Sequence, residues 1–347
     1  MQEEKNNTKE ITIYDIAEIL KISPSTVSRA LNDHHSISKS TKKKVLETAQ
    51  KLGYRFNRFA KNLREQKSYV IGVVIPRLDS YFMSTVISGM ENHAKLSGYN
   101  IIITQSNENI EKELKCVEML YNSRVDGIII SFSAYTKNLD HLDFILKKKI
   151  PLVIFDRYIE YPGITSIVID NYKAAFDIVS HMINEGCKNI VHITDNINCS
   201  VYQERLNGYK EALNKYGLDY NEKFLFEKNL YNSNFKKLSN DILNLRPFPD
   251  GIFASNDYAA VNILLELKKR NIKIPDEIAI AGFNDDPIAS VVEPNLTTIK
   301  YPGMLMGEVA VKTLIEIING QNMPVINKLI LSHELIVRKS TIKNLSI

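Results

Sequence analysis

Polar residues that could bind a small molecule stand where several apolar segments of the chain end. Asp156 and Arg157 close the segment 152–156, and Asn256 follows the segment 251–254. In a parallel sheet the carboxyl ends of the strands meet at one edge, which is where ligands bind. A carboxylate beside a guanidinium supplies acceptors and a fixed fork of donors, a combination that suits vicinal hydroxyl groups. The same positions also suit helix caps or structural ion pairs, so each residue has a structural alternative.

The elements that must position these residues alternate between strands and helices. The apolar pattern predicts strands over 70–75, 101–105, 127–131, 152–156, 166–169, 190–194, 251–254 and 278–283. Between most of them it predicts helices, such as 85–97, 111–123, 174–185 and 258–270. This alternation is typical of parallel sheets covered by helices on both faces. The segments RVDGIIIS at 124–131 and FPDGIFAS at 248–255 resemble each other, which predicts two similar lobes with a cleft between them.

The first fifty residues have a different pattern, with three short helices predicted over 14–20, 24–31 and 39–52. Thr12 and Ser38 are candidate N-caps, and Ser23 followed by Pro24 is a strong helix-start signal. Two short helices joined by a tight turn indicate a helix-turn-helix, whose second helix enters the DNA major groove. Its outward face carries short hydroxyls and Arg29, which could grip guanine bidentately. The alternative is an unrelated three-helix bundle with a solvated polar face.

Charge is distributed unevenly along the 347 residues. Residues 1–67 contain 14 lysines and arginines against 8 acidic residues, whereas the other 280 contain 30 against 32. A basic head on a nearly neutral body favours a polyanion contact confined to the head, although a lysine-rich solvated helix would give the same balance.

Several protein classes are disfavoured by composition. Hydrophobic residues make up 44% and charged residues 24%, as in globular proteins, and no apolar run reaches the length of a membrane span. The polar start, 1–10, lacks the features of a signal peptide. The three cysteines, Cys116, Cys187 and Cys199, have no metal-ligand spacing and are interpreted as thiols in a reducing cytoplasm. No motif of an enzyme is present, and no metal or cofactor is expected.

The stretch 11–31, ITIYDIAEILKISPSTVSRAL, resembles the DNA-binding domain of the lactose-repressor (LacI/GalR) family of regulators. The resemblance is strongest in the T-x-x-D-I-A and S-T-V-S-R-x-L-N elements, and it extends over nearly the whole chain. It implies an all-α helix-turn-helix domain at 10–55 and a hinge helix and linker at 56–67. It also implies an α/β periplasmic-binding-protein-like body at 68–347, built of two doubly wound parallel-sheet lobes that bind effector and dimerise. The first lobe is expected at 68–160 and 297–329 and the second at 165–290 and 332–345, with crossings near 157–168, 284–296 and 330–334.

The resemblance also assigns DNA-binding roles to individual residues. Base-reading positions of the family fall on Pro24, Ser25 and Arg29. Its phosphate-contacting positions fall on Thr12, Tyr14, Ser23, Thr26, Ser28, Asn32 and Thr41. Leu63 matches a leucine that wedges into the minor groove, supported by Asn57 and Ala60; the alternative is a linker with an incidental leucine. Lys21 stands where the family usually has glycine, and Phe56 replaces the proline usual before the hinge helix.

The expected effector site combines the residues at strand ends with positions that match the family. Asp156, Arg205 and Asn256 match its effector-binding positions, and Arg205 is expected to open a helix. Asn284 stands where aspartate is common, so this site loses a charge. The complete set of expected contacts is Tyr81, Phe82, Ser131, Asp156, Arg157, Arg205, Asn256 and Asn284.

The expected function is that of a cytoplasmic, homodimeric regulator, acting as a repressor on near-palindromic operator DNA. A sugar or sugar derivative between the lobes is expected to control its operator affinity, because Asp156–Arg157 resembles a pair found in sugar-binding members of the fold. A purine or another metabolite stays open. The rivals are an enzyme and a solute-binding protein that feeds a transporter.

Overall fold

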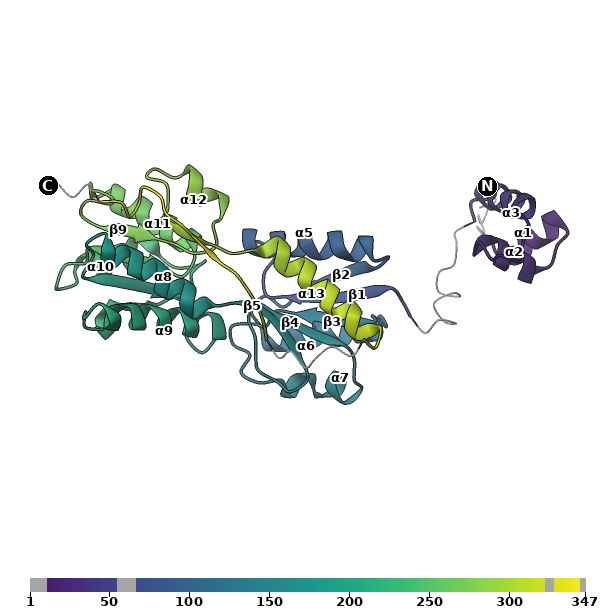
Figure 1. Cartoon of the computed structure of the whole chain (residues 1–347), viewed down its shortest axis with the longest axis horizontal. Helices are drawn as coiled ribbons and strands as arrows, with labels where there is room; N and C mark the ends of the chain where they lie inside the picture. Colours follow the sequence, from purple (N-terminus) through teal and green to yellow (C-terminus); the bar gives the residue numbers. More distant parts are fainter. Residues whose placement is uncertain (1–10, 55–66, 322–327, 344–347) are drawn as a thin grey trace, which may run out of the picture. The chain divides into compact units, whose positions relative to one another are not determined.

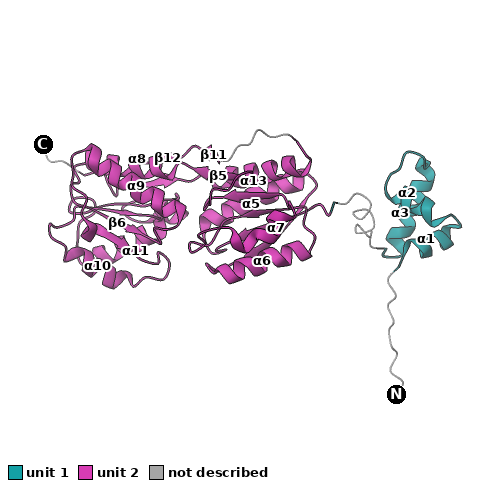
Figure 2. Cartoon of the chain, turned by 90° about the horizontal axis from the view of Figure 1, so that it is seen from below, with its two compact units in different colours: residues 1–67 teal, residues 68–347 magenta. Residues whose placement is uncertain are grey.

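The computed structural model describes residues 11–54, 67–321 and 328–343 of the chain. The chain divides into two compact units, residues 1–67 and residues 68–347, which are coloured separately in Figure 2. Each unit has its own hydrophobic core. In the part that the structure describes, no helix is long and apolar enough to cross a membrane.

The N-terminal unit consists of α1 (Ile13–Leu20), α2 (Pro24–Leu31) and α3 (Lys39–Lys51), as the sequence predicts to within one residue at each end. Each helix starts at a predicted cap. Thr12 donates its backbone N–H to the Asp15 carboxylate at 2.6 Å, and the Ser23 hydroxyl accepts from the N–H of Thr26 at 3.1 Å. The three helices bury one small core, formed by Ile16, Ala17, Val27, Ala30, Val45 and Ala49.

Lys21 ends α1 in the left-handed conformation, with φ of 53°. This backbone region favours glycine because a Cβ atom is crowded there, which explains why the matching family position is usually glycine. The lysine therefore introduces local strain into the turn of the helix-turn-helix, and the turn still forms.

The larger unit has two parallel sheets, and all eight predicted strands are present with ends shifted by at most two residues. The strand order in the first sheet is β11 (Lys328–Leu331), β5 (Thr165–Ile169), β4 (Leu152–Phe155), β3 (Gly127–Ile130), β1 (Val70–Ile75) and β2 (Asn100–Gln105). The order in the second is β7 (Leu225–Glu227), β6 (Ile190–Thr194), β8 (Gly251–Ala254) and β9 (Ala279–Ala281). Each sheet forms the centre of one lobe (Figure 1).

Helices cover both faces of each sheet. In the first lobe α5 (Tyr81–Leu96) and α13 (Gly303–Ile318) pack on one face, and α6 (Ile110–Asn122) and α7 (Asp143–Lys147) on the other. In the second lobe α8 (Asn171–Asn184) and α9 (Ser200–Lys215) pack opposite α10 (Phe235–Leu243) and α11 (Asp257–Lys268). The short helices are α12 (Pro287–Val291) and the 3₁₀ turns Asp140–Leu142 and Glu222–Phe224. The predicted doubly wound architecture is confirmed.

The first crossing of the chain between the lobes lies later in the sequence than predicted, because β5 belongs to the first lobe. This strand pairs in parallel with β4, with Ile154 opposite Ser166, and with β11 on its other side, so it belongs to the first sheet. The expected start of the second lobe at residue 165 is therefore wrong, and the first crossing follows Ile169. The other two crossings use β10 (Thr298–Lys300) and β12 (Glu334–Ile336), which pair antiparallel with each other. The C-terminal strands, in yellow in Figure 1, run between the lobes.

Close contact between α5 and α13 depends on two glycines that face the opposite helix. A Cβ atom on Gly307 would lie 2.0 Å from the Val86 carbonyl oxygen, and one on Gly89 would lie 2.0 Å from the Met304 carbonyl oxygen. Backbone oxygens cannot move aside as a flexible side chain does, so both positions need glycine. This contact fixes α5, whose first turn borders the pocket described next.

Candidate functional site

A pocket lies between the two lobes of the larger unit. Six of the eight expected effector residues line it: Phe82, Asp156, Arg157, Arg205, Asn256 and Asn284. The structure does not bring the other two, Tyr81 and Ser131, to the pocket wall. Tyr81 begins α5 and is 49% exposed, whereas Ser131 is fully buried just after β3. Six further side chains with polar groups line the pocket and were not in the expected set: Arg77, Ser80, Tyr202, Tyr231, Ser255 and Tyr301.

Asp156 carries the acceptor group of the first lobe. Its Oδ1 accepts a hydrogen bond from the Tyr301 hydroxyl at 2.7 Å, and only 7% of the residue is exposed. Burial raises the pKa of this carboxyl, and the neighbouring Arg157 guanidinium opposes the shift. Its backbone has a φ of 59°, a conformation that aspartate tolerates better than most residues. The carboxyl is thus held in place before any ligand binds.

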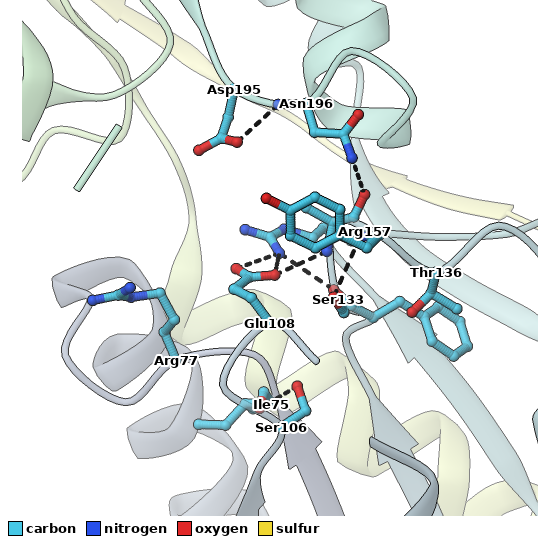
Figure 3. A network of polar contacts seen from close by, with 12 residues as sticks. Ile75, Arg77, Ser106, Glu108, Ser133, Thr136, Arg157, Asp195 and Asn196 are labelled. Atoms are coloured by element: carbon cyan, nitrogen blue, oxygen red, sulfur yellow. Dashed lines mark hydrogen bonds and ion pairs between the residues drawn. The ribbon is translucent and has the colours of Figure 1, made fainter. Parts of the chain in front are cut away.

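Part of the fork of donors that the sequence suggested for Arg157 is already engaged within the protein. Its Nη1 donates to both carboxylate oxygens of Glu108, at 2.7 and 2.8 Å, and Glu108 also accepts from the N–H of Ala134 at 2.9 Å (Figure 3). Glu108 comes from the loop after β2, 49 positions away along the chain. No local sequence signal links the two residues. Arg157 lines the pocket, and its contact with an effector stays a prediction.

Arg205 carries the cationic group of the second lobe. It lies inside α9, which begins at Ser200, so the expectation that Arg205 opens a helix is wrong. Its Nε donates to the Asn171 side-chain oxygen at 3.0 Å and its Nη1 to the Ser255 carbonyl at 2.6 Å. The guanidinium carbon lies 3.6 Å from the centroid of the Phe283 ring. Burial lowers the pKa of Arg205, because a desolvated cation is disfavoured.

Asn256, which follows a strand end, both caps a helix and presents a hydrogen-bond donor to the pocket. Its Oδ1 caps α11 by accepting from the N–H of Ala259 at 2.8 Å. Its Nδ2 is buried and has no hydrogen-bond partner among the described residues. Because buried N–H groups nearly always have partners, an unpaired donor on a pocket wall indicates an absent acceptor. Asn284 reaches the same wall from a strained loop position with φ of 117°.

The lobes also contact each other directly across the cleft. The Asn196 side chain donates to the Ala134 carbonyl at 2.8 Å, as drawn in Figure 3, and the Tyr158 hydroxyl donates to Glu204 at 2.6 Å. The guanidinium of Arg77 lies 4.5 Å from the centroid of the Tyr231 ring. Arg77 lies two residues after the end of β1, so the strand-end reasoning could have identified it. Tyr231 lies in irregular chain between β7 and α10, where the sequence carries no such signal.

The N-terminal unit presents its expected DNA contacts on its surface. None of the ten expected contacts within the described residues of this unit is buried, and Tyr14 is 68% exposed. The Ser23 hydroxyl bonds to those of Ser25 and Thr26 at 2.8 Å each, which makes a compact polar start to α2. Arg29 is exposed and has no acidic partner within 4.0 Å in the described part of the chain. Asn57, Ala60 and Leu63 lie outside the described residues.

Comparison with known proteins finds two family models on this chain. Residues 12–57 match the model of bacterial regulatory proteins of the lacI family, and residues 179–341 match a periplasmic binding protein-like domain. Catabolite control protein A of Priestia megaterium is 32% identical over 313 residues, which cover 90% of this chain and 93% of that protein. The chain belongs to the LacI family.

Further LacI-family proteins match over most of their length. The ribose operon repressor of Halalkalibacterium halodurans is 30% identical, covering 88% of this chain and 89% of that protein. The lac repressor dimer bound to operator and the anti-inducer ONPF matches with a TM-score of 0.86 at 24% identity, over 96% of this chain and 99% of that one, which supports the fold. The protein is a DNA-binding transcriptional regulator and not an enzyme. The predicted family, fold class and regulatory function are confirmed.

Proposed function

We propose that the chain is a cytoplasmic homodimeric repressor of a near-palindromic operator. A carbohydrate bound between its lobes changes its affinity for that operator. The proposed ligand site is supported by the polar groups that face the pocket from both lobes. Asp156 stands on the first lobe, whereas Arg205 and the unpaired Nδ2 of Asn256 stand on the second. A ligand that touches both lobes binds the closed arrangement more tightly than the open one, and this differential affinity shifts the equilibrium between them.

The proposed DNA interface is the exposed face of α1 and α2. Arg29 would read a base, while the Ser23 and Thr26 hydroxyls would hold phosphate at the start of α2. Two copies are needed because one eight-residue recognition helix reads few base pairs. Asn57, Ala60 and Leu63 complete the interface as minor-groove contacts by resemblance to the family. Leu63→Ala should then reduce operator affinity and DNA bending while leaving effector binding unchanged, as measured with circularly permuted fragments.

The test of this function starts from DNA. The operator is selected from a random duplex library with the full-length protein, and its affinity is then measured with and without candidate sugars. A typical allosteric coupling of about 1–3 kcal/mol would change operator affinity by about 5–150-fold. Arg205→Ala should bind operator normally and lose the response to sugar. Selection of no preferred duplex, or occupancy of a single half-site by a monomer, would contradict the proposal; binding of purines instead of sugars would contradict only the ligand class.

A further inference from the structure

Three arginines line the pocket, and they differ in how their charge is balanced. Arg77 donates from Nε to the Asp79 carboxylate at 2.8 Å. Arg157 donates to Glu108 at 2.7 and 2.8 Å. Arg205 has no carboxylate within 4.0 Å among the described residues, and its hydrogen-bond acceptors are a neutral amide and a backbone carbonyl. The pocket therefore contains one guanidinium whose charge has no direct counter-ion.

The environment of Arg205 makes this imbalance costly. The residue is only 4% exposed, and one face of the guanidinium lies against the Phe283 ring. Nε and Nη1 are engaged, whereas Nη2 makes no hydrogen bond to the described residues. Removing an unpaired ion from water is unfavourable unless an opposite charge or strong acceptors replace the water. A ligand that brings an oxyanion to Nη2 would supply both.

An amide group in the lining of the same pocket also lacks an acceptor. Nδ2 of Asn256 is unpaired on the pocket wall. Asn256 is more than nine-tenths buried. An unpaired amide N–H and a guanidinium N–H are donors only, so one group with several acceptor lone pairs would satisfy both. A carboxylate is such a group.

Asp156, on the first lobe's side of the pocket, has the complementary chemistry. Asp156 Oδ1 is held by Tyr301, and its Oδ2 accepts no hydrogen bond from the described residues. This oxygen suits a ligand hydroxyl and repels an anion, which directs any negative group toward Arg205. Asn284 adds an amide where the resemblance to the family leads one to expect aspartate, so this chain lacks a carboxylate that would compete for the cation.

We infer that the effector is a carbohydrate acid: a sugar or polyol whose single carboxylate binds Arg205 and Asn256 and whose hydroxyls bind Asp156. This inference rests on the proposed function and narrows its ligand class. One unpaired cation matches one negative charge, whereas a phosphate monoester carries about 1.5 to 2 negative charges at neutral pH. Because Arg77 and Arg157 are already paired, the pocket offers no second free guanidinium among the described residues for such a group.

The test compares charged and neutral ligands of the same shape on the full-length protein at constant ionic strength. The probes are D-gluconate, D-glucuronate and D-galacturonate, with D-glucose, D-galactose and glucose 6-phosphate as comparisons, and the readouts are calorimetric affinity and the shift in Tm. At least one carboxylate should bind about tenfold or more tightly than its neutral counterpart, a difference of about 1.4 kcal/mol. Arg205→Met should abolish that preference. Lys215→Gln, which removes an exposed cation of the same helix, should leave it unchanged.

Asn284→Asp gives a second arm that does not depend on Arg205 tolerating substitution. The new carboxylate would add a negative charge to the pocket wall and repel an anionic ligand, so carboxylate affinity should decrease about tenfold or more and the preference for anions should disappear. The inference is overturned if neutral sugars bind as well as the acids, if glucose 6-phosphate binds more tightly than every carboxylate, or if no carboxylate raises the Tm. It is also overturned if Asn284→Asp leaves the preference intact. The proposed function fails separately, if no ligand of either class alters operator affinity.

Discussion

Substitution of Asp257 by asparagine should remove a loss of stability that the larger unit undergoes as pH rises. Asp257 is the first residue of α11 and is fully buried. Its oxygens accept from the Thr298 hydroxyl and from the N–H of Asp286, each at 2.7 Å, and no cation bonds to it among the described residues. Burial, reinforced by the charge of Asp286, raises the pKa of this carboxyl to about 7.

The direction of the effect follows from proton linkage. Between about pH 4 and 7 the folded protein retains a proton on Asp257 that the unfolded chain has released, so its contribution to stability decreases as pH rises. A difference of about three pKa units corresponds to about 4 kcal/mol, because one unit is worth about 1.36 kcal/mol. For a unit of this size, about 4 kcal/mol of stability corresponds to a fall in Tm of about 7 °C. His192 acts oppositely, since burial lowers its pKa to about 3 and favours the folded state as pH rises to about 6.5.

The measurement is therefore the difference in Tm between parent and Asp257→Asn across this pH range. The asparagine amide is uncharged at every pH, can accept from the N–H of Asp286 and can donate to the Thr298 hydroxyl. The two proteins should melt alike near pH 4, and the variant should become progressively more stable than the parent toward pH 8. Asp276→Asn, at an exposed carboxylate of the same lobe, is the control and should follow the parent. A constant difference between parent and Asp257→Asn at all pH values would refute the reasoning.

Three further predictions concern the elements around the two sites. Arg29→Ala should reduce the protein's preference for operator over mutated duplexes by about 1–3 kcal/mol, whereas Ser23→Ala should weaken binding to every duplex equally. Competition binding measures both effects, and an equal loss of selectivity in the two variants would contradict these roles. Lys21→Gly should stabilise the N-terminal unit by about 1 kcal/mol in calorimetry, because it relieves a left-handed backbone; an unchanged or lower Tm counts against strain there. Gly307→Ala should destabilise the larger unit by about 1–3 kcal/mol in urea unfolding, because the added methyl group meets a backbone oxygen. No change in stability would show that α5 and α13 can separate freely.

Local signals in the sequence were enough to predict the N-terminal unit. Ser23 followed by Pro24 starts α2, and the spacing of Ile16, Val27 and Val45 predicts its three-helix core. Such signals act within one or two turns of helix, where capping and periodicity decide the conformation. The eight strands of the body were predicted for the same reason, because each is a short apolar run between polar turns.

Long-range pairing is what the sequence did not reveal. An apolar run indicates a strand but not the sheet it joins, so β5 was assigned to the wrong lobe. The three-residue strands β10 and β12 are too short for a periodic signal. The sequence also gave no sign that Arg157 pairs with Glu108, because Glu108 lies in another loop, where its backbone has a positive φ of 54°. In each case the deciding contact joins segments that are distant along the chain.

The connectivity of the larger unit favours effector contacts with its first lobe as the direct route to DNA binding. The linker from the N-terminal unit enters this lobe at Ser68, whose N–H and hydroxyl both donate to the Asp126 carboxylate, at 2.6 and 2.8 Å. The second lobe is connected to the first through the three crossings and through contacts such as the bond from Asn196 to the Ala134 carbonyl. A ligand held by Arg205 alone would bond only to the second lobe, whereas one that also bonds to Asp156 would link the two lobes directly. Asp156→Asn should therefore reduce the ligand's effect on operator affinity more than Asn256→Ala does, even where both variants lose the same affinity for ligand.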